Sequence, residues 1–86
     1  MDKILKDMRR ESKSLSPHVI IGKNGLTVPV INNIRLELSK HRMIKIRILK
    51  TYMNGKDKRE VFANIALQTN ARIVHILGFT ITLVRK

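Results

Sequence analysis

Residues 18–27 read His18-Val19-Ile20-Ile21-Gly22-Lys23-Asn24-Gly25-Leu26-Thr27, an apolar run followed by a two-glycine loop and a threonine that can cap a helix. The apolar run predicts a short strand, because it is rich in β-branched residues and is bounded by glycine. Glycines let a loop take positive φ and leave its N–H groups uncovered, so another backbone or a phosphate can come close. We therefore expect Gly22–Gly25 to be a contact site.

The segments on either side alternate between helical and strand periodicity. Apolar residues at helical spacing predict three helices, over residues 2–14, 28–41 and 57–69. Alternating or β-branched runs predict four strands, at residues 18–21, 44–49, 72–77 and 80–85, the last two as an antiparallel hairpin. Between them, residues 51–56 contain the turn signal Asn54-Gly55, and we expect a turn there.

The predicted order is α-β-α-β-α-β-β. Helices that alternate with strands cross over the face of a sheet, so the sequence predicts the α/β class: a compact two-layer or open sandwich with a four-stranded mixed sheet. A length of 86 residues suits a single domain over residues 1–86 with one core. We expect the apolar side of the first helix, with Ile4, Leu5 and Met8, to contribute to that core.

The charge of the chain is strongly unbalanced. Eighteen Lys and Arg face six Asp and Glu, a formal net charge of +12. Such an excess attracts polyanions, which makes nucleic acid the first partner to consider and an anionic membrane the second. The most basic segment, which we predict to be a polyanion footprint, contains Lys40, Arg42, Lys45, Arg47, Lys50, Lys56, Lys58 and Arg59.

Residues that carry enzyme chemistry are scarce. The chain has no cysteine, and His18, His41 and His75 lie on different predicted elements without metal-ligand spacing. His18 and His75 could approach each other on the sheet. No P-loop, dinucleotide fingerprint or catalytic serine motif is present. We therefore predict no enzyme activity, catalytic residue, metal, cofactor or small-molecule substrate.

Aromatic residues indicate how a nucleic acid would be held. Tyr52, Phe62 and Phe79 are the only aromatic rings of the Phe, Tyr and Trp type, and Phe62 is expected in the core. A platform on which bases stack needs more exposed rings than this. A GxxG loop suits contact with the backbone instead, since KH domains clamp nucleotides with such a loop.

Several motifs together resemble the CRM domain family, a small RNA-binding module also called YhbY-like. They are Gly22–Thr27 after a strand, Met43–Ile48, Thr69-Asn70-Ala71, and a final hairpin with Gly78, Thr80–Leu83 and Arg85. The resemblance implies a fold like the C-terminal domain of translation initiation factor three, with the glycine loop touching RNA. Free-standing bacterial members associate with precursors of the large ribosomal subunit, and plant organellar relatives assist group II intron splicing; this chain resembles the first kind.

Charge, loop and resemblance together predict an RNA-binding protein that acts in assembly of the large ribosomal subunit. Gly22 and Gly25 would allow close approach, Lys23 would neutralise a phosphate, and the N–H groups near Thr27 would add a positive helix end. The remaining predicted contacts are Asn24, Lys45, Arg47, Lys6, Arg10, Lys13 and, from the resemblance, Arg85. The charged start and the lack of a long apolar run predict a cytoplasmic protein, for which we favour a monomer.

Two other functions stay open at this point. An architectural DNA-binding protein of the Alba kind is also small and basic, and it normally works as a dimer on duplex DNA. A peripheral membrane protein could attach through the cationic first helix. That helix contains no Trp or Phe, and we expect its apolar side to be occupied by the core, so the membrane alternative is the weakest.

Overall fold

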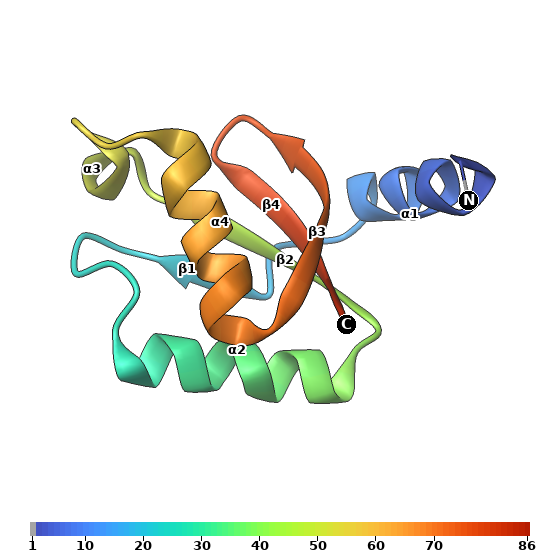
Figure 1. The fold of residues 1–86 in the computed structure, drawn as a ribbon, viewed down its shortest axis with the longest axis horizontal. Helices are drawn as coiled ribbons and strands as arrows, with labels where there is room; N and C mark the ends of the chain where they lie inside the picture. Colours follow the sequence, from blue (N-terminus) through green and yellow to red (C-terminus); the bar gives the residue numbers. More distant parts are fainter. Residues whose placement is uncertain (1) are drawn as a thin grey trace.

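The computed structural model describes residues 2–86 and places helices on both faces of a four-stranded sheet (Figure 1). In chain order the elements are α1 (Asp2–Lys13), β1 (Val19–Ile21), α2 (Val28–Lys40), β2 (Met43–Ile48), α3 (Lys50–Met53), α4 (Lys58–Thr69), β3 (Ala71–Leu77) and β4 (Thr80–Arg85). The predicted α/β class is confirmed, as are the three longer helices and the C-terminal hairpin.

The sheet has the strand order β1-β2-β4-β3 and is mixed, as predicted. β1 pairs with β2 in parallel, and the other two pairs are antiparallel. Because β1 and β2 run the same way, the segments that follow them emerge together, and the N–H of Leu49 donates to the carbonyl of Ile21 at 3.0 Å. We call this end of the sheet, with residues 22–27 and 49–57, the loop end.

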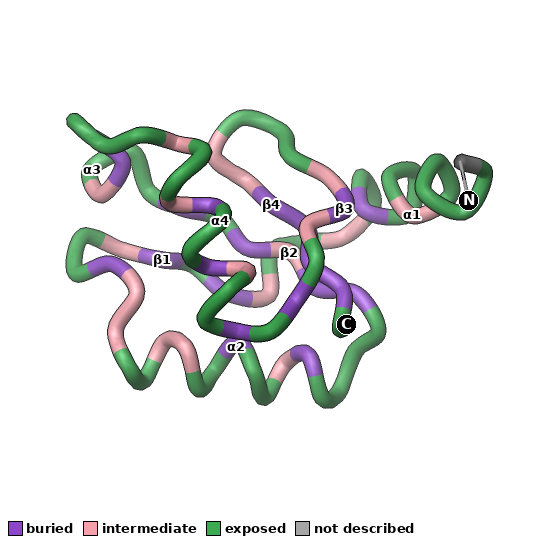
Figure 2. The backbone as a smooth tube through the Cα atoms, viewed as in Figure 1, coloured by how far each residue is buried: buried purple, intermediate pink, exposed green. Residues whose placement is uncertain are grey.

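The main core lies between one face of the sheet and the helices α2 and α4. Ile44, Ile46 and Ile48 of β2 are at most 1% exposed and point into it, so the predicted alternation of this strand is confirmed. The other fully or nearly fully buried core residues include Ile21, Ile34, Leu38, Phe62, Ile65, Ile81 and Leu83. Figure 2 shows this buried region at the centre of the molecule.

The first helix packs less than its sequence predicts. α1 lies against the opposite face of the sheet at the end away from the loops, which we call the helix end, and its first turns run past the sheet (Figure 1). Ile4 is 56% exposed and Leu5 is 37% exposed, so the expectation that both contribute to the core is wrong. Met8 and, just after the helix, Leu15 pack in a small cluster on Met43, Val74 and Val84. Amphipathicity predicted which side is apolar, not what covers it.

Polar contacts hold the second half of α1. The hydroxyls of Ser12 and Thr82 hydrogen-bond to each other in a fully buried setting. Lys45 Nζ donates to the carbonyls of Ser12 and Leu15, both at 3.2 Å. Carbonyls at a helix C-terminus lack partners within the helix and favour a nearby cation. The charge of Lys45 is therefore used inside the molecule.

The segment predicted as a turn over residues 51–56 is partly helical, which corrects that prediction. Residues 50–53 form α3, and the turn follows at Asn54-Gly55, where Gly55 has φ of 77°. A four-residue helix has no periodicity that a sequence pattern can reveal, and its N-cap, Leu49, makes no side-chain cap. α3 buries Met53 and places Tyr52 beside the glycine loop.

Capping residues mark the start of α2, as predicted for Thr27, and both ends of α4. Thr27 caps α2 by accepting from the N–H of Val30 at 3.4 Å, and Asp57 caps α4 by accepting from the N–H of Arg59 at 2.9 Å. Asn70 ends α4 in the left-handed region, with φ of 54°. The predicted starts and stops therefore have a direct structural cause. Within residues 2–86, no helix is long and apolar enough to cross a bilayer.

The histidines are arranged differently from the predicted approach of His18 and His75. β1 and β3 are the two edges of the sheet, so those residues lie far apart. His18 instead stacks against His41, with ring centroids 4.9 Å apart, and its Nδ1 accepts from the N–H of Lys45 at 3.0 Å. In the described part of the chain, no three metal-ligating side chains come together.

Candidate nucleic-acid interface

The glycine loop, Gly22–Gly25, is a tight turn in which the two glycines have different structural roles. The N–H of Gly25 donates to the carbonyl of Gly22 at 3.0 Å, and that of Thr27 donates to Gly25 at 3.1 Å. Gly25 has φ of 74°, a conformation that favours glycine, whereas Gly22 is not in that region. The turn therefore requires glycine only at position 25.

Gly25 is buried beneath the ring of Tyr52. A Cβ at Gly25 would lie 2.8 Å from Cζ of that ring and closer still to Cε1. The space beside Gly25 is thus filled by Tyr52 of the same chain. The expectation that this glycine lets a ligand come close is wrong. Gly22 is different, since its Cβ would meet only Leu49 Cδ1, at 4.0 Å, and the residue is partly exposed.

Lys23 and Asn24 form the tip of the loop, and both are exposed. Neither makes a side-chain hydrogen bond or an ion pair with another described residue. The adjoining start of α2 offers fewer donors than an ordinary helix end, because Pro29 has no N–H and Thr27 caps Val30. The loop tip, rather than the helix end, therefore presents the available polar groups.

The two cations predicted on the outer face of β2 separate in the structure. Lys45 is half-buried and bound to α1, as described above, whereas Arg47 is exposed and lies between Ile20 of β1 and Thr80 of β4 in the register of the sheet. Arg47 lines an open groove of about 450 Å³ on this face. The other lining residues are Pro17, Lys45, Ile48, Leu49, Lys50, Phe79 and Thr80.

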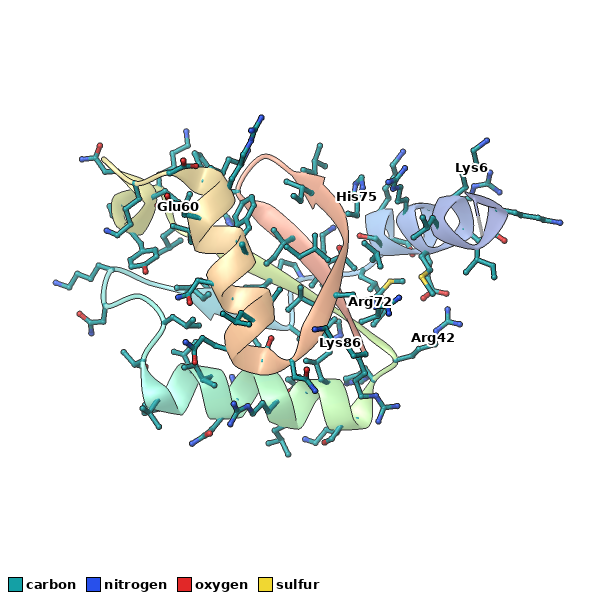
Figure 3. All side chains as sticks on the ribbon, in the orientation of Figure 1. Lys6, Arg42, Glu60, Arg72, His75 and Lys86 are labelled. Atoms are coloured by element: carbon teal, nitrogen blue, oxygen red, sulfur yellow. The ribbon has the colours of Figure 1, made fainter. Side chains whose placement is uncertain are left out.

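The predicted cations of α1 and the C-terminus lie away from the loop. Lys6, Arg10 and Lys13 are exposed along α1, and Figure 3 shows Lys6 at the far end of that helix. Because β4 runs antiparallel to β2, its last residue, Arg85, lies beside Ala71 at the helix end. The predicted contacts thus form two groups in a molecule whose longest dimension is 35 Å.

Comparison with known proteins identifies the family of the chain. The sequence profile of the CRS1/YhbY (CRM) domain matches residues 1–85. The chain belongs to the CRM domain family. A Methanocaldococcus jannaschii protein, named a probable RNA-binding protein, is 30% identical over 83 residues, which are 96% of this chain and 61% of that protein. This CRM chain therefore spans about three-fifths of the length of that curated relative.

A solved structure has a similar fold. It is the solution structure of a Staphylococcus aureus hypothetical protein described as a candidate RNA-binding protein. Its TM-score is 0.80 at 24% identity, and the match covers 100% of this chain and 88% of that one. At this identity the similarity establishes a shared CRM fold.

The loop end of this CRM domain contains residues that the sequence did not connect with the glycine loop. Lys50 and Lys56 were part of the basic segment, but nothing in the sequence placed them beside Gly22–Gly25. Tyr52 covers Gly25, and Lys56 Nζ lies 4.4 Å from the centroid of its ring. A prediction that the first two strands pair in parallel would have placed residues 50–56 beside the glycine loop, because parallel pairing brings together the segments that follow the two strands.

Proposed function

We propose that this CRM domain binds RNA through the sugar-phosphate backbone at its loop end, and that the RNA belongs to a precursor of the large ribosomal subunit. The observation that carries the proposal is the set of exposed cations around the glycine loop, Lys23, Arg47 and Lys50, which make no hydrogen bond or ion pair with another residue that the structure describes. The family and the names of the relatives support RNA as the polyanion.

The register of the sheet supports a continuous track for the backbone. Ile21 pairs with Ile48, so the residues that follow, Gly22 and Lys23, leave β1 beside Leu49 and Lys50. Arg47 and Lys50 line the same groove on the outer face. A strand that crosses the loop tip and enters this groove would meet three cations in succession, each able to neutralise a phosphate.

The arrangement of the rings supports backbone contact over stacking. Phe62 is 2% exposed, Tyr52 packs on Gly25, and Phe79 has Lys58 Nζ 5.4 Å from its centroid. None of these rings forms an open platform of the kind on which successive bases stack. The rings therefore favour contact with the RNA backbone, and we propose that the domain acts by binding alone, as a cytoplasmic monomer.

A charge reversal at the loop tip tests the loop. Lys23→Asp with Asn24→Asp should weaken binding of single-stranded RNA by about tenfold or more, because it removes one phosphate contact and adds two repulsive charges. The matched control is Lys3→Asp with Ser16→Asp, which changes the net charge equally at exposed positions of α1 and its linker. Equal losses in both folded variants would assign the effect to net charge and refute the loop as the site.

The salt dependence of binding gives a second measure. The logarithm of the association constant should fall with the logarithm of salt concentration by about 0.7 per phosphate neutralised on a single strand. Competition with duplex DNA at equal salt distinguishes this function from architectural DNA binding. The ribosomal target is tested by crosslinking in cells and sequencing the attached RNA; recovery of introns in place of ribosomal precursors would overturn that part of the proposal.

A further inference from the structure

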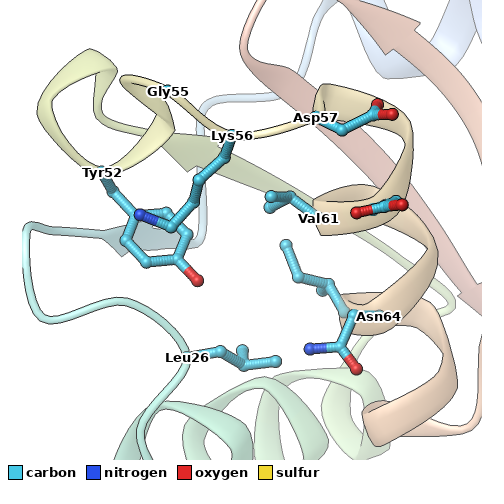
Figure 4. Close-up of a pocket in the computed structure, with 9 residues that line it drawn as sticks. Leu26, Tyr52, Gly55, Lys56, Asp57, Val61 and Asn64 are labelled. Carbon is cyan, nitrogen blue, oxygen red and sulfur yellow. The ribbon is translucent and has the colours of Figure 1, made fainter.

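A second concave site adjoins the glycine loop on the side of α4 (Figure 4). Its volume is about 440 Å³, within the usual range for small-ligand sites. The residues that matter for its chemistry are Leu26, Tyr52, Lys56, Asp57, Glu60 and Asn64. Leu26 directly follows Gly25, so the cavity begins where the proposed backbone site ends.

The lining combines apolar surface with hydrogen-bonding groups. Leu26 and Val61 supply apolar surface, and Figure 4 shows the hydroxyl of Tyr52 pointing toward the cavity. The amide of Asn64 comes from the facing side of α4. A flat, partly apolar group with polar edges fits such a lining.

The cavity differs in charge from the loop tip, because its lining contains two carboxylates and one cation, Lys56, whose Nζ lies over the ring of Tyr52. Asp57 and Glu60 both line the cavity, in a chain with only six acidic residues. One oxygen of Asp57 caps α4, while Glu60 makes no ion pair or side-chain hydrogen bond with any described residue. Carboxylates repel a phosphate and accept hydrogen bonds from N–H donors. The two carboxylates therefore make this cavity less suited to a phosphate than the loop tip is, and Glu60 can accept from a group that donates.

We propose that the cavity receives an unpaired nucleobase with an exocyclic amino group, from the strand whose backbone crosses the glycine loop. The inference rests on the proposed RNA-binding function and adds base selection to it. Cytosine presents an N4 amino group where uracil presents the O4 acceptor. The carboxylate of Glu60 can accept from the amino group, whereas facing O4 it leaves two acceptors opposed.

The test compares a single-stranded oligouridine with the same strand that carries one central cytosine. The protein should bind the cytosine strand about fivefold or more tightly, the discrimination expected from one base contact. Glu60→Gln should abolish that preference, because the new amide can donate to O4 of uracil. Glu60 is exposed on α4, so this variant should keep its fold, which its melting temperature checks.

A loop variant separates the two proposals. Lys23→Asp with Asn24→Asp should weaken both strands by the same factor and leave their ratio unchanged, since it alters only the backbone site. Tight but equal binding of the two strands by the unmodified protein would overturn the base pocket and leave the proposed function intact. A preference that survives in both Glu60→Gln and Asn64→Ala would also overturn it. Failure to bind either strand would overturn both proposals.

Discussion

The loop end and the helix end are both rich in exposed cations, but at the helix end three basic side chains are bound within the protein. At the helix end Lys45 donates to Ser12 and Leu15, Arg9 Nε donates to the carbonyl of Val74 at 3.3 Å, and Arg42 pairs with Glu11. Lys23 and Lys50 of the loop end, and Arg47 of the adjoining groove, make no such contact within the described chain. A count of charges therefore overstates the surface available to a polyanion, because Arg9, Arg42 and Lys45 are bound within the protein. The cations of α1, Lys6, Arg10 and Lys13, stay exposed, as do those around the glycine loop.

The backbone explains why the two ends differ. The carbonyls of Ser12 and Leu15, at and just after the end of α1, accept from the side chain of Lys45 of β2. At the loop end, backbone groups hydrogen-bond to each other: the N–H of Gly25 donates to the carbonyl of Gly22, and the N–H of Leu49 donates to the carbonyl of Ile21. The side chains of Lys23 and Lys50 make no hydrogen bond or ion pair with a described residue and stay available to a ligand.

The largest effect is expected from Gly25→Ala, which tests whether the loop end depends on backbone fit. A Cβ there combines positive φ with a clash against Tyr52, and should lower the free energy of unfolding by about 2–4 kcal/mol. Gly22→Ala is the matched control and should change it by about 0.5 kcal/mol or less, because its conformation and surroundings accept a methyl group. Urea unfolding measures both; equal stabilities would contradict both the strain at positive φ and the clash with Tyr52.

The parts of this fold that the sequence predicts are the helices and strands with a regular spacing of apolar residues. Ile44, Ile46 and Ile48 point inward as their alternation requires, and Thr27, Asp57 and Asn70 end helices where their chemistry requires. α3 is too short for a period. The exposure of Ile4 depends on where the sheet ends, which is a tertiary property that no local pattern contains.

The sequence motif identifies the loop tip of the candidate site, but it does not identify the residues that surround the loop in the fold. Lys23 and Asn24 follow from the motif itself. The position of Tyr52 over Gly25 depends on which segments fold beside β2. So does the difference between Lys45, which is bound to Ser12, and Arg47, which is exposed. Two basic residues on the same side of one strand are equivalent in a sequence pattern, and only the position of α1 makes them different.

The pair Lys45 and Arg47 gives the next largest effect. Lys45→Met keeps the aliphatic stem but removes two charge-assisted hydrogen bonds to α1, and should destabilise the protein by about 2 kcal/mol with little change in RNA affinity. Arg47→Met should do the reverse, with stability changed by about 0.5 kcal/mol or less and RNA affinity reduced severalfold. Unfolding and RNA titration of both variants measure this; a stronger loss of RNA affinity in Lys45→Met would remove the distinction between the two ends.

The buried hydroxyl pair at the helix end should give an intermediate effect. Ser12→Ala or Thr82→Val alone leaves the other hydroxyl buried without its partner, at a cost of about 1–2 kcal/mol in the free energy of unfolding. The double variant removes both polar groups and should be more stable than the sum of the single changes predicts. A double-mutant cycle by urea unfolding measures the coupling; additive losses would show that the hydroxyls act independently.

The smallest effect is expected at Arg42, whose ion pair with Glu11 joins α1 to the turn before β2. Arg42 Nη2 lies 3.2 Å from Glu11 Oε1, but the two side chains are 67% and 47% exposed, so water and salt screen the attraction. Arg42→Ala should therefore change the free energy of unfolding by about 0.5 kcal/mol or less. A cycle with Glu11→Ala, measured at low and high salt, isolates the pair. A coupling well above about 1 kcal/mol would contradict this, because only a water-excluded pair reaches that strength. It would mean that electrostatics at the helix end rivals the buried contacts of Lys45 in holding α1 to the sheet.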